Sequence, residues 1–148
     1  MNELSKTRTE GAREEIRTDW VPKDRWVGPD IARLERERLW PRIWHIACRE
    51  EEIPSVGDYV TYEIFDESII LIRSDEDTVS AYYNVCQHRG RRLVKPGKGI
   101  SKGGFQCRFH GWKWDLEGNN TFVFHPEQWD GCPAFTTDAL ALKQPRID

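Results

Sequence analysis

The spacing of hydrophobic and polar residues divides the chain into a short helical part and a longer part with strand periodicity. Residues 29–40 place their apolar side chains roughly on one face of a helix. Pro29 suits the first helical position, and Pro41 ends the pattern because proline cannot continue a helix. We therefore predict a short amphipathic helix over residues 29–40. Ahead of it, Trp20 and Trp26 predict an extended arm anchored by aromatic rings.

After the helix the apolar period changes to two, and β-branched and aromatic residues become frequent. Residues 117–120, Glu-Gly-Asn-Asn, are typical of a hairpin turn. The pattern predicts a mainly β, antiparallel body behind the N-terminal arm and helix, with an arm-and-helix part over residues 1–44 and a β domain over 45–148. The expected strands are Trp44–Cys48, Tyr59–Phe65, Ile69–Arg73, Thr78–Asn84, Phe105–Gln106, Lys113–Leu116 and Thr121–Phe124.

Composition fits an ordinary globular domain. The chain is 38% hydrophobic and 32% charged. Its 148 residues are enough to bury a core without disulfides. No apolar run approaches the roughly 20 residues that span a bilayer, and the polar N-terminus lacks the apolar segment of a signal peptide. We therefore expect a cytoplasmic protein that does not associate with a membrane and has no disulfide framework.

Two short segments combine one cysteine, one histidine and a glycine. The first is Cys86-Gln87-His88-Arg89-Gly90, and the second is Cys107-Arg108-Phe109-His110-Gly111-Trp112. Each follows or joins predicted strands, so each is expected to be a loop. Gly90 and Gly111 allow a tight turn close to a bound group.

Thiolates and imidazoles are metal ligands, and their spacing separates two kinds of site. In a Rieske [2Fe–2S] centre, two cysteines hold one iron and two histidines hold the other. Each loop would then supply one ligand to each iron, which favours Cys86, His88, Cys107 and His110 as ligands. The alternative is a structural zinc site, but zinc sites usually pair like residues locally, as Cys-x₂₋₄-Cys and His-x₃₋₅-His.

The sequence CQHRG…CRFHGWKWDLEGN resembles the Rieske domain of the large (α) subunits of Rieske non-haem iron ring-hydroxylating oxygenases. The resemblance covers roughly residues 20–145 and is most specific in the two loops. It implies a Rieske iron–sulfur fold, a β sandwich with two cluster-binding loops. It also implies that Cys86 and Cys107 bind the inner iron and that His88 and His110 bind the outer one. Arg89 and Trp112 match positions that border the cluster, next to Gly90 and Gly111.

The resemblance further implies a place in an electron-transfer chain. The α subunits pass electrons from a ferredoxin or reductase to a mononuclear iron that activates O₂, and they form homotrimers. In that family an aspartate of the neighbouring subunit contacts one cluster histidine, and His110 is the matching position. His110 is therefore the expected electron relay. The alternative is a stand-alone Rieske-type ferredoxin, although such proteins normally lack the arm and helix.

One difference separates this chain from respiratory Rieske proteins and favours the oxygenase family, and a second is a departure from the oxygenase α subunits themselves. Respiratory Rieske proteins carry a disulfide between the loops and a serine that hydrogen-bonds the cluster, whereas this chain has Arg91, Phe109 and Trp112 at those positions. Fewer hydrogen bonds to sulfur predict a potential in the lower part of the Rieske range, from about −150 mV upward. The second departure is that no facial triad for a mononuclear Fe(II) is found, so the catalytic domain is expected to be absent and the chain truncated.

Basic residues concentrate around the two motifs. Between residues 86 and 114 there are eight basic side chains and no Asp or Glu, although the whole chain carries a net charge of −3. Such a collar either offsets the charge of the cluster or steers an acidic electron donor toward the histidines. Nucleic-acid binding is disfavoured by the acidic remainder of the chain. The eight are Arg89, Arg91, Arg92, Lys95, Lys98, Lys102, Arg108 and Lys113.

The remaining cysteines and histidines are assigned no chemistry. Cys48 is expected to be a small buried hydrophobe and Cys132 to be partly exposed. His45 is expected to pack beside Trp44, while His125, ahead of a proline, is expected in a loop.

Overall fold

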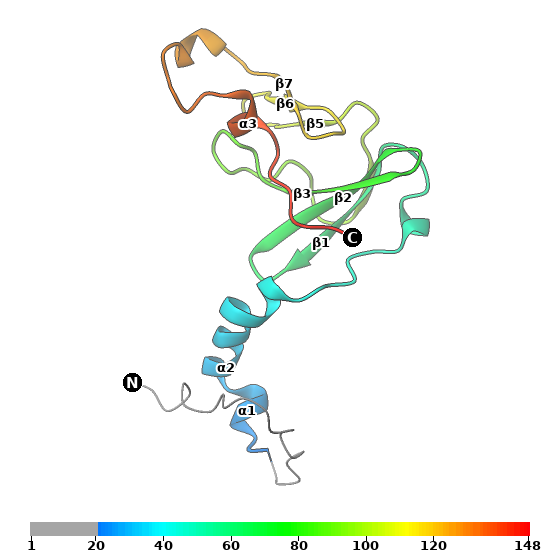
Figure 1. The fold of residues 1–148 in the computed structure, drawn as a ribbon, viewed down its shortest axis with the longest axis vertical. Helices are drawn as coiled ribbons and strands as arrows, with labels where there is room; N and C mark the ends of the chain where they lie inside the picture. Colours follow the sequence, from blue (N-terminus) through cyan, green and yellow to red (C-terminus); the bar gives the residue numbers. More distant parts are fainter. Residues whose placement is uncertain (1–20) are drawn as a thin grey trace, which may run out of the picture. The chain divides into compact units, whose positions relative to one another are not determined.

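In the computed structural model, which describes residues 21–148, the chain forms two compact units. The first ends at Ile43, and its described residues, 21–43, are mostly helical, whereas the second runs from Trp44 to Asp148 and contains both β-sheets (Figure 1). Trp20, one of the two expected anchors of the arm, lies outside the described residues. None of the helices within residues 21–148 is long and apolar enough to cross a membrane.

The helical unit consists of consecutive short pieces. Helix α1 spans Asp24–Val27 and α2 spans Pro29–Leu34, with Pro29 in the first turn as predicted. The helix then widens to π-helical hydrogen bonding over Glu35–Leu39 and ends in a 3₁₀ turn, Trp40–Arg42. The predicted helix over residues 29–40 is thus present, with a change of hydrogen-bond pattern in its second half.

The prediction of an extended arm anchored by Trp26 is wrong. Pro22 opens a helical turn, because its carbonyl accepts a hydrogen bond from the N–H of Arg25 at 3.0 Å. Trp26 therefore lies within α1, where its side chain is 77% exposed.

A four-stranded antiparallel sheet forms the first half of the β unit. Its strands are β1 (Asp58–Ile64), β2 (Glu67–Asp75), β3 (Thr78–Tyr83) and β4 (Lys98–Ile100), in the order β3-β2-β1-β4. The central strand β2 is buried on both faces, since the consecutive residues 70–74 are all buried.

A three-stranded antiparallel sheet forms the second half. It contains β5 (Phe105–Gln106), β6 (Lys113–Trp114) and β7 (Asn120–Phe122) in the order β5-β6-β7. The predicted hairpin turn lies between β6 and β7. The mainly β, antiparallel fold expected from the sequence is therefore confirmed.

One expected strand is absent from the structure, and one observed strand was not expected. Trp44–Cys48 was expected to be a strand, but these residues pair with no sheet, and Ile46 is 94% exposed. Alternating apolar residues need a neighbouring strand to become part of a sheet, and no strand of the described part of the chain lies beside this segment. Conversely, β4 was not expected, because the Lys-Gly-Ile sequence is short and poor in strand-forming residues.

The hydrophobic core lies between the two sheets and is closed by the C-terminal part of the chain. Its buried members come from β2 and β3, from β5 and β6, from the two ligand loops and from the C-terminal segment. They are Ile70, Ile72, Tyr82, Cys86, Leu93, Phe105, Cys107, Trp112, Trp114 and Leu142.

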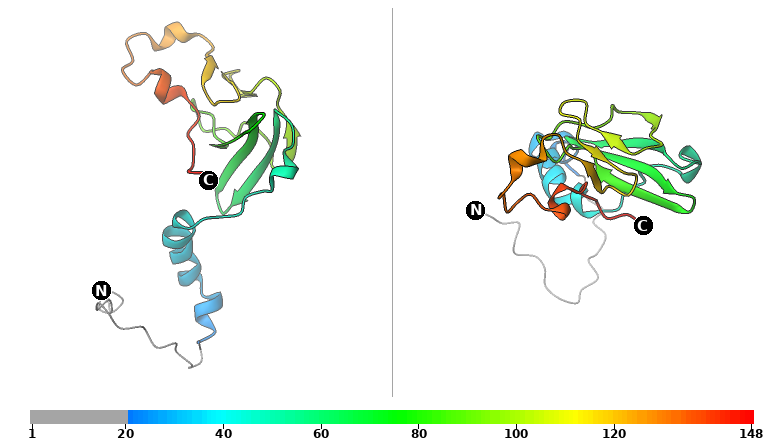
Figure 2. Two further views of the ribbon diagram at one scale, coloured as in Figure 1. Left: turned by 45° about the vertical axis from the view of Figure 1, so that its right-hand side comes forward. Right: turned by 90° about the horizontal axis from the view of Figure 1, so that it is seen from above.

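A C-terminal strap, residues 140–143, joins the two sheets directly after helix α3 (Thr137–Leu140). The indole N–H of Trp114 donates to the Leu140 carbonyl at 2.7 Å, and the N–H of Leu142 donates to the Gly118 carbonyl at 2.8 Å. The next residue's carbonyl accepts from the N–H of Tyr83 at 2.9 Å. Figure 2 shows this red segment leaving α3 and running past the four-stranded sheet.

Candidate metal centre

The two predicted ligand segments fold into loops with the same closing hydrogen bonds. The N–H of Cys86 donates to the Arg91 carbonyl at 2.8 Å, and the N–H of Gly90 donates to the Cys86 carbonyl at 2.9 Å. In the second loop, the N–H of Cys107 donates to the carbonyl five residues later, and the N–H four residues later donates back to the Cys107 carbonyl, both at 2.9 Å. Each loop is thus a closed six-residue turn that begins at its cysteine.

Glycine is required at the fifth position of both turns. Gly90 has φ = 70° and Gly111 has φ = 76°, which is the left-handed region that side chains disfavour. A Cβ on Gly90 would meet no atom within 4 Å, and one on Gly111 would meet a single side-chain nitrogen at 3.8 Å. The two glycines are therefore explained by the backbone conformation of the turns, with open space beside them.

The two cysteines lie together in the interior. Cys86 is 3% exposed and Cys107 is 2% exposed, and the two thiols are close enough for each to shift the pKa of the other. Burial raises the pKa of Cys86, and the neighbouring Cys107 raises it further. Burial alone would raise the pKa of Cys107 too, but the backbone N–H groups of Phe109 and His110 and the Cys86 thiol hold it below its usual value. The thiolate, which these backbone N–H groups favour, is the form that binds metal.

The two histidines form a second pair. The ring centroids of His88 and His110 are 4.6 Å apart. Nδ1 of His88 is buried and has no hydrogen-bond partner, which is costly for a polar atom unless something binds it. Burial lowers the pKa of His88, and the positive charges of His110 and Arg89 lower it further, so the ring is held in the neutral form that ligates metals.

The donor set fits a two-iron cluster. Within residues 21–148, no three His, Cys, Asp or Glu side chains surround a single point that one metal ion could occupy. The four predicted ligands are instead a buried thiol pair and a half-buried imidazole pair. A Rieske [2Fe–2S] cluster needs two ligands on each of two irons, and the unpartnered Nδ1 of His88 offers one of them.

An aromatic cluster holds the ring of His88. The indole of Trp112 stacks on His88 with 4.8 Å between centroids and 7° between planes, and Trp129 meets it edge-on at 5.8 Å. Phe135 stacks on Trp129 at 5.4 Å and 6°. Trp112 was expected beside the cluster, whereas Trp129 and Phe135 were missed. The only sequence signal for these two residues was that they are aromatic, because they lie many residues after the second ligand segment.

The basic residues around the loops divide into two groups. Arg92 pairs with Glu63 at 2.9 Å and Lys98 pairs with Glu52 at 2.7 Å, so their charges are already compensated. Arg89, Arg91 and Arg108 are exposed, and none of the three has an acidic partner within the described part of the chain. Three of the charges without an acidic partner in the described part of the chain therefore lie in the ligand loops themselves, and the others are on Lys95, Lys102 and Lys113.

The remaining cysteines and histidines lie outside this centre. Cys132 is exposed, as expected, whereas Cys48 is only half-buried and does not behave as a core residue. Nδ1 of His45 is hydrogen-bonded to the Tyr62 hydroxyl at 3.1 Å, and exposed His125 lies 2.6 Å from Glu127. All four cysteines are free.

Comparison with known proteins identifies residues 43–130 as a match to the model of the Rieske [2Fe-2S] domain. The large subunit of anthranilate 1,2-dioxygenase from Acinetobacter baylyi is 33% identical over 127 residues, which is 86% of this chain and 26% of that protein. The carnitine monooxygenase oxygenase subunit of Escherichia coli is also 33% identical, over 86% of this chain and 35% of that protein.

Among solved structures, naphthalene 1,2-dioxygenase bound to phenanthrene is similar in fold. It superposes with a TM-score of 0.71 and 30% sequence identity, over 80% of this chain and 26% of that chain. The chain therefore spans about a quarter to a third of the length of the relatives it matches.

Proposed function

Because this chain belongs to the Rieske [2Fe–2S] domain family, we propose that Cys86, His88, Cys107 and His110 hold its cluster. The observation that carries the assignment is the buried, unpartnered Nδ1 of His88 beside the ring of His110. When bound, the cluster supplies reversible one-electron transfer. The thiols lie in the core and the imidazoles are half-exposed, so the histidine side is the one that faces outside partners.

The chain's own residues orient the four proposed ligands. The two closed turns fix the cysteine backbone, and the Trp112 ring fixes the plane of His88. The ring centroids of His110 and Phe109 are 3.9 Å apart and the two rings are tilted, so His110 is not held in a parallel stack. His110 is therefore the proposed relay toward an acceptor.

Substitution of the four ligands tests the assignment. Cys86→Ser, His88→Ala, Cys107→Ser and His110→Ala should each abolish the visible and electron paramagnetic resonance spectra of the cluster. The matched controls are Cys132→Ser and His125→Ala, which change the same residue types outside the loops. Anaerobically purified wild-type protein should contain about two irons and two sulfides per chain. A colourless protein with about one zinc per chain would refute the assignment.

We further propose that the chain is the electron-transfer part of a Rieske oxygenase α subunit. It would take electrons from a ferredoxin or reductase and pass them to a mononuclear iron that activates O₂. The oxygenase subunits among its relatives support this, as does the extent of the similarity beyond residues 43–130. The stand-alone carrier is the alternative. The genomic sequence downstream separates them, since an in-frame His-x₄-His pair with a distal Asp supports the oxygenase and its absence supports the carrier.

The three uncompensated arginines support an acidic electron donor as the partner. Arg89, Arg91 and Arg108 lie in the two loops that hold the proposed ligands, so a negatively charged protein surface would be drawn to the histidine side. The two cysteines that are not proposed ligands, Cys48 and Cys132, form no disulfide, which supports a reducing compartment such as the cytoplasm.

A further inference from the structure

The side chain of Asn84 is completely buried two residues before Cys86. Its Oδ1 accepts hydrogen bonds from the N–H groups of Leu93 at 2.9 Å and Val94 at 3.0 Å. Its Nδ2 donates to the Val94 carbonyl at 2.9 Å and to Oγ of Ser68 at 3.0 Å. The amide thus uses its two donors and both lone pairs of its oxygen.

The two ligand loops are held in different ways, and this difference shows what the hydrogen bonds of Asn84 contribute. The second loop is entered by β5 and left by β6, which pair directly at Gln106 and Lys113. The first loop follows β3, but its return arm, residues 91–97, belongs to no strand. Asn84 supplies with its side chain the cross-loop hydrogen bonds that paired strands supply in the second loop.

A second chain of contacts anchors the same return arm. Ser68 Oγ donates to Glu63 Oε1 in addition to accepting from Asn84, and Glu63 Oε2 accepts from Arg92 at 2.9 Å. Arg92 directly precedes Leu93, so the contacts form a closed ring from Asn84 through β2 and β1 back to the loop. Three consecutive residues of the return arm are therefore held in place.

We propose that Asn84 is a positioning residue that holds the return arm of the first ligand loop and so sets Cys86 and His88 against Cys107 and His110. The inference rests on the ligand assignment made above. Asn84 touches no reacting group and acts only through the loop.

Two substitutions separate the parts of this amide's role. Asn84→Asp keeps the size and the acceptor for the N–H groups of Leu93 and Val94, but turns a carboxylate oxygen toward the Val94 carbonyl. Asn84→Leu keeps the approximate volume and removes every hydrogen bond, which leaves buried backbone groups without partners. The aspartate variant should fold more readily, so it keeps the test decisive if the leucine variant does not fold.

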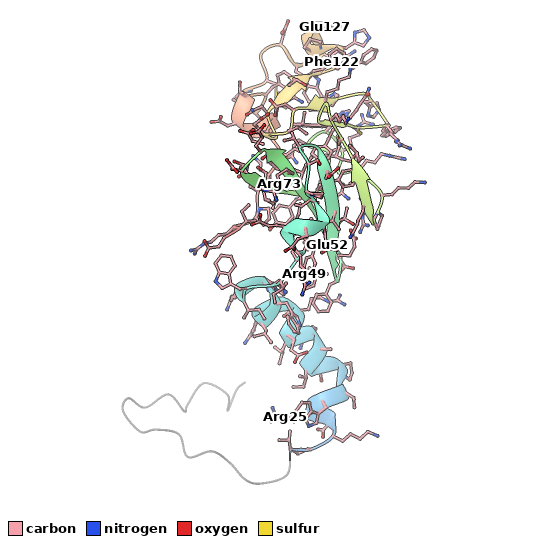
Figure 3. All side chains as sticks on the ribbon, turned by 90° about the vertical axis from the view of Figure 1, so that its right-hand side faces the viewer. Arg25, Arg49, Glu52, Arg73, Phe122 and Glu127 are labelled. Carbon is pink, nitrogen blue, oxygen red and sulfur yellow. The ribbon has the colours of Figure 1, made fainter. Side chains whose placement is uncertain are left out.

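Arg73→Met is the matched control for a general loss of stability. Arg73 is also buried on β2, and its Nε donates to the Ile53 carbonyl at 3.1 Å. Arg73 lies at the opposite end of β2 from Ser68, beside the turn that contains Glu52. Arg73 and Glu52 are labelled in Figure 3. Its substitution should lower the melting temperature without reaching the ligand loops.

Three measurements on the anaerobically purified chain test the proposal. In both Asn84 variants, the oxidised cluster should show an altered visible circular dichroism spectrum, and the reduced cluster should show shifted g-values. The cluster should be lost roughly tenfold faster than in wild type. Amide hydrogen exchange in the peptide containing Leu93 and Val94 should also accelerate. Arg73→Met should leave the spectra and this exchange unchanged.

Wild-type spectra, cluster lifetime and amide exchange in Asn84→Asp would overturn the proposal. Equal spectral changes in Arg73→Met would also overturn it, because they would show that any loss of stability disturbs the cluster. Failure of the ligand assignment looks different, because the wild-type chain itself would then lack a two-iron cluster.

Discussion

The guanidinium of Arg91 lies over the ring of Phe109, with 6.0 Å between its central carbon and the ring centroid. Arg91 closes the first ligand loop and Phe109 belongs to the second, so this contact joins the loops at their surface. These are the two positions at which the resemblance places the disulfide of respiratory Rieske proteins. A non-covalent contact here takes the place of a covalent one.

Removal of this contact should loosen the loops with little loss of global stability. Phe109 is 58% exposed, and an exposed cation–π contact contributes about 0.5–1 kcal/mol. Phe109→Ala should therefore lower the free energy of unfolding by no more than about 1 kcal/mol and accelerate cluster loss. Chemical denaturation and the decay of visible absorbance measure the two effects. Unchanged cluster loss would show that the contact does not hold the loops.

Neighbouring arginines should differ in their effect on electron transfer. Arg91→Gln and Arg92→Gln remove the same charge from adjacent positions, but only Arg92 is paired with an acid. At low ionic strength, reduction by an acidic ferredoxin should slow roughly severalfold more in Arg91→Gln, and added salt should reduce the difference. Stopped-flow reduction at several salt concentrations measures this. Equal rates for the two variants would contradict the steering role of the uncompensated arginines.

Trp112 should matter more than any other aromatic residue in the site. It is 3% exposed and stacks on His88, so Trp112→Ala should lower the free energy of unfolding by about 3–5 kcal/mol and release the histidine. Trp26→Ala is the control, because its side chain is 77% exposed and its loss should cost less than about 0.5 kcal/mol. Thermal unfolding and cluster absorbance distinguish the two. A Trp112→Ala variant with wild-type stability would refute the packing role.

Glu52 should contribute stability that depends on pH. Its hydrogen bond to Lys98 and the backbone N–H of Arg49 lower the pKa of its carboxyl from the ordinary value of 4.5. The ionised form is favoured by folding, so the contribution is present above that value and is lost as the pH falls through the lowered pKa. An NMR titration of the Glu52 carboxyl carbon should show this, and Lys98→Gln should move the pKa back up. Lys95→Gln, which removes a charge elsewhere, should not.

The C-terminal strap should be part of the folding unit although it lies beyond the matched residues 43–130. Leu142 is 4% exposed in the core, so Leu142→Ala should lower the free energy of unfolding by about 2–5 kcal/mol. Ile147→Ala, at a side chain that is 45% exposed, should have little effect. Urea denaturation of both variants measures the difference. Equal stabilities would show that the strap is dispensable.

The sequence predicted what depends on local pattern. The hairpin of β1 and β2 follows from two runs rich in β-branched and aromatic residues on either side of a short polar turn, and the ligand loops follow from the types and spacing of four residues. Trp44–Cys48 also has a strand-like pattern, but none of the strands within residues 21–148 lies beside it, and periodicity alone does not reveal a missing partner. Strand β4 exists for the opposite reason, because pairing with β1 compensates for a poor strand sequence.

The residues that support the site were harder to predict because they act across long sequence separations. Asn84 is an ordinary polar residue until the fold brings Leu93 and Val94 to its amide. Phe135 reaches the site by packing against Trp112 and Trp129, after an irregular segment that carries no periodic signal. Ligand chemistry is visible in a sequence, whereas the packing that orients the ligands depends on tertiary structure.

The matching hydrogen bonds of the two ligand loops also determine which genetic changes the centre tolerates. In each loop the closing bonds count residues from the cysteine, so any side chain between cysteine and glycine other than the histidine can change without altering the turn. An inserted or deleted residue would shift the glycine out of its position and turn the histidine away from its partner. We therefore expect relatives of this domain to differ in the other amino acids of these loops while the lengths of the loops stay constant.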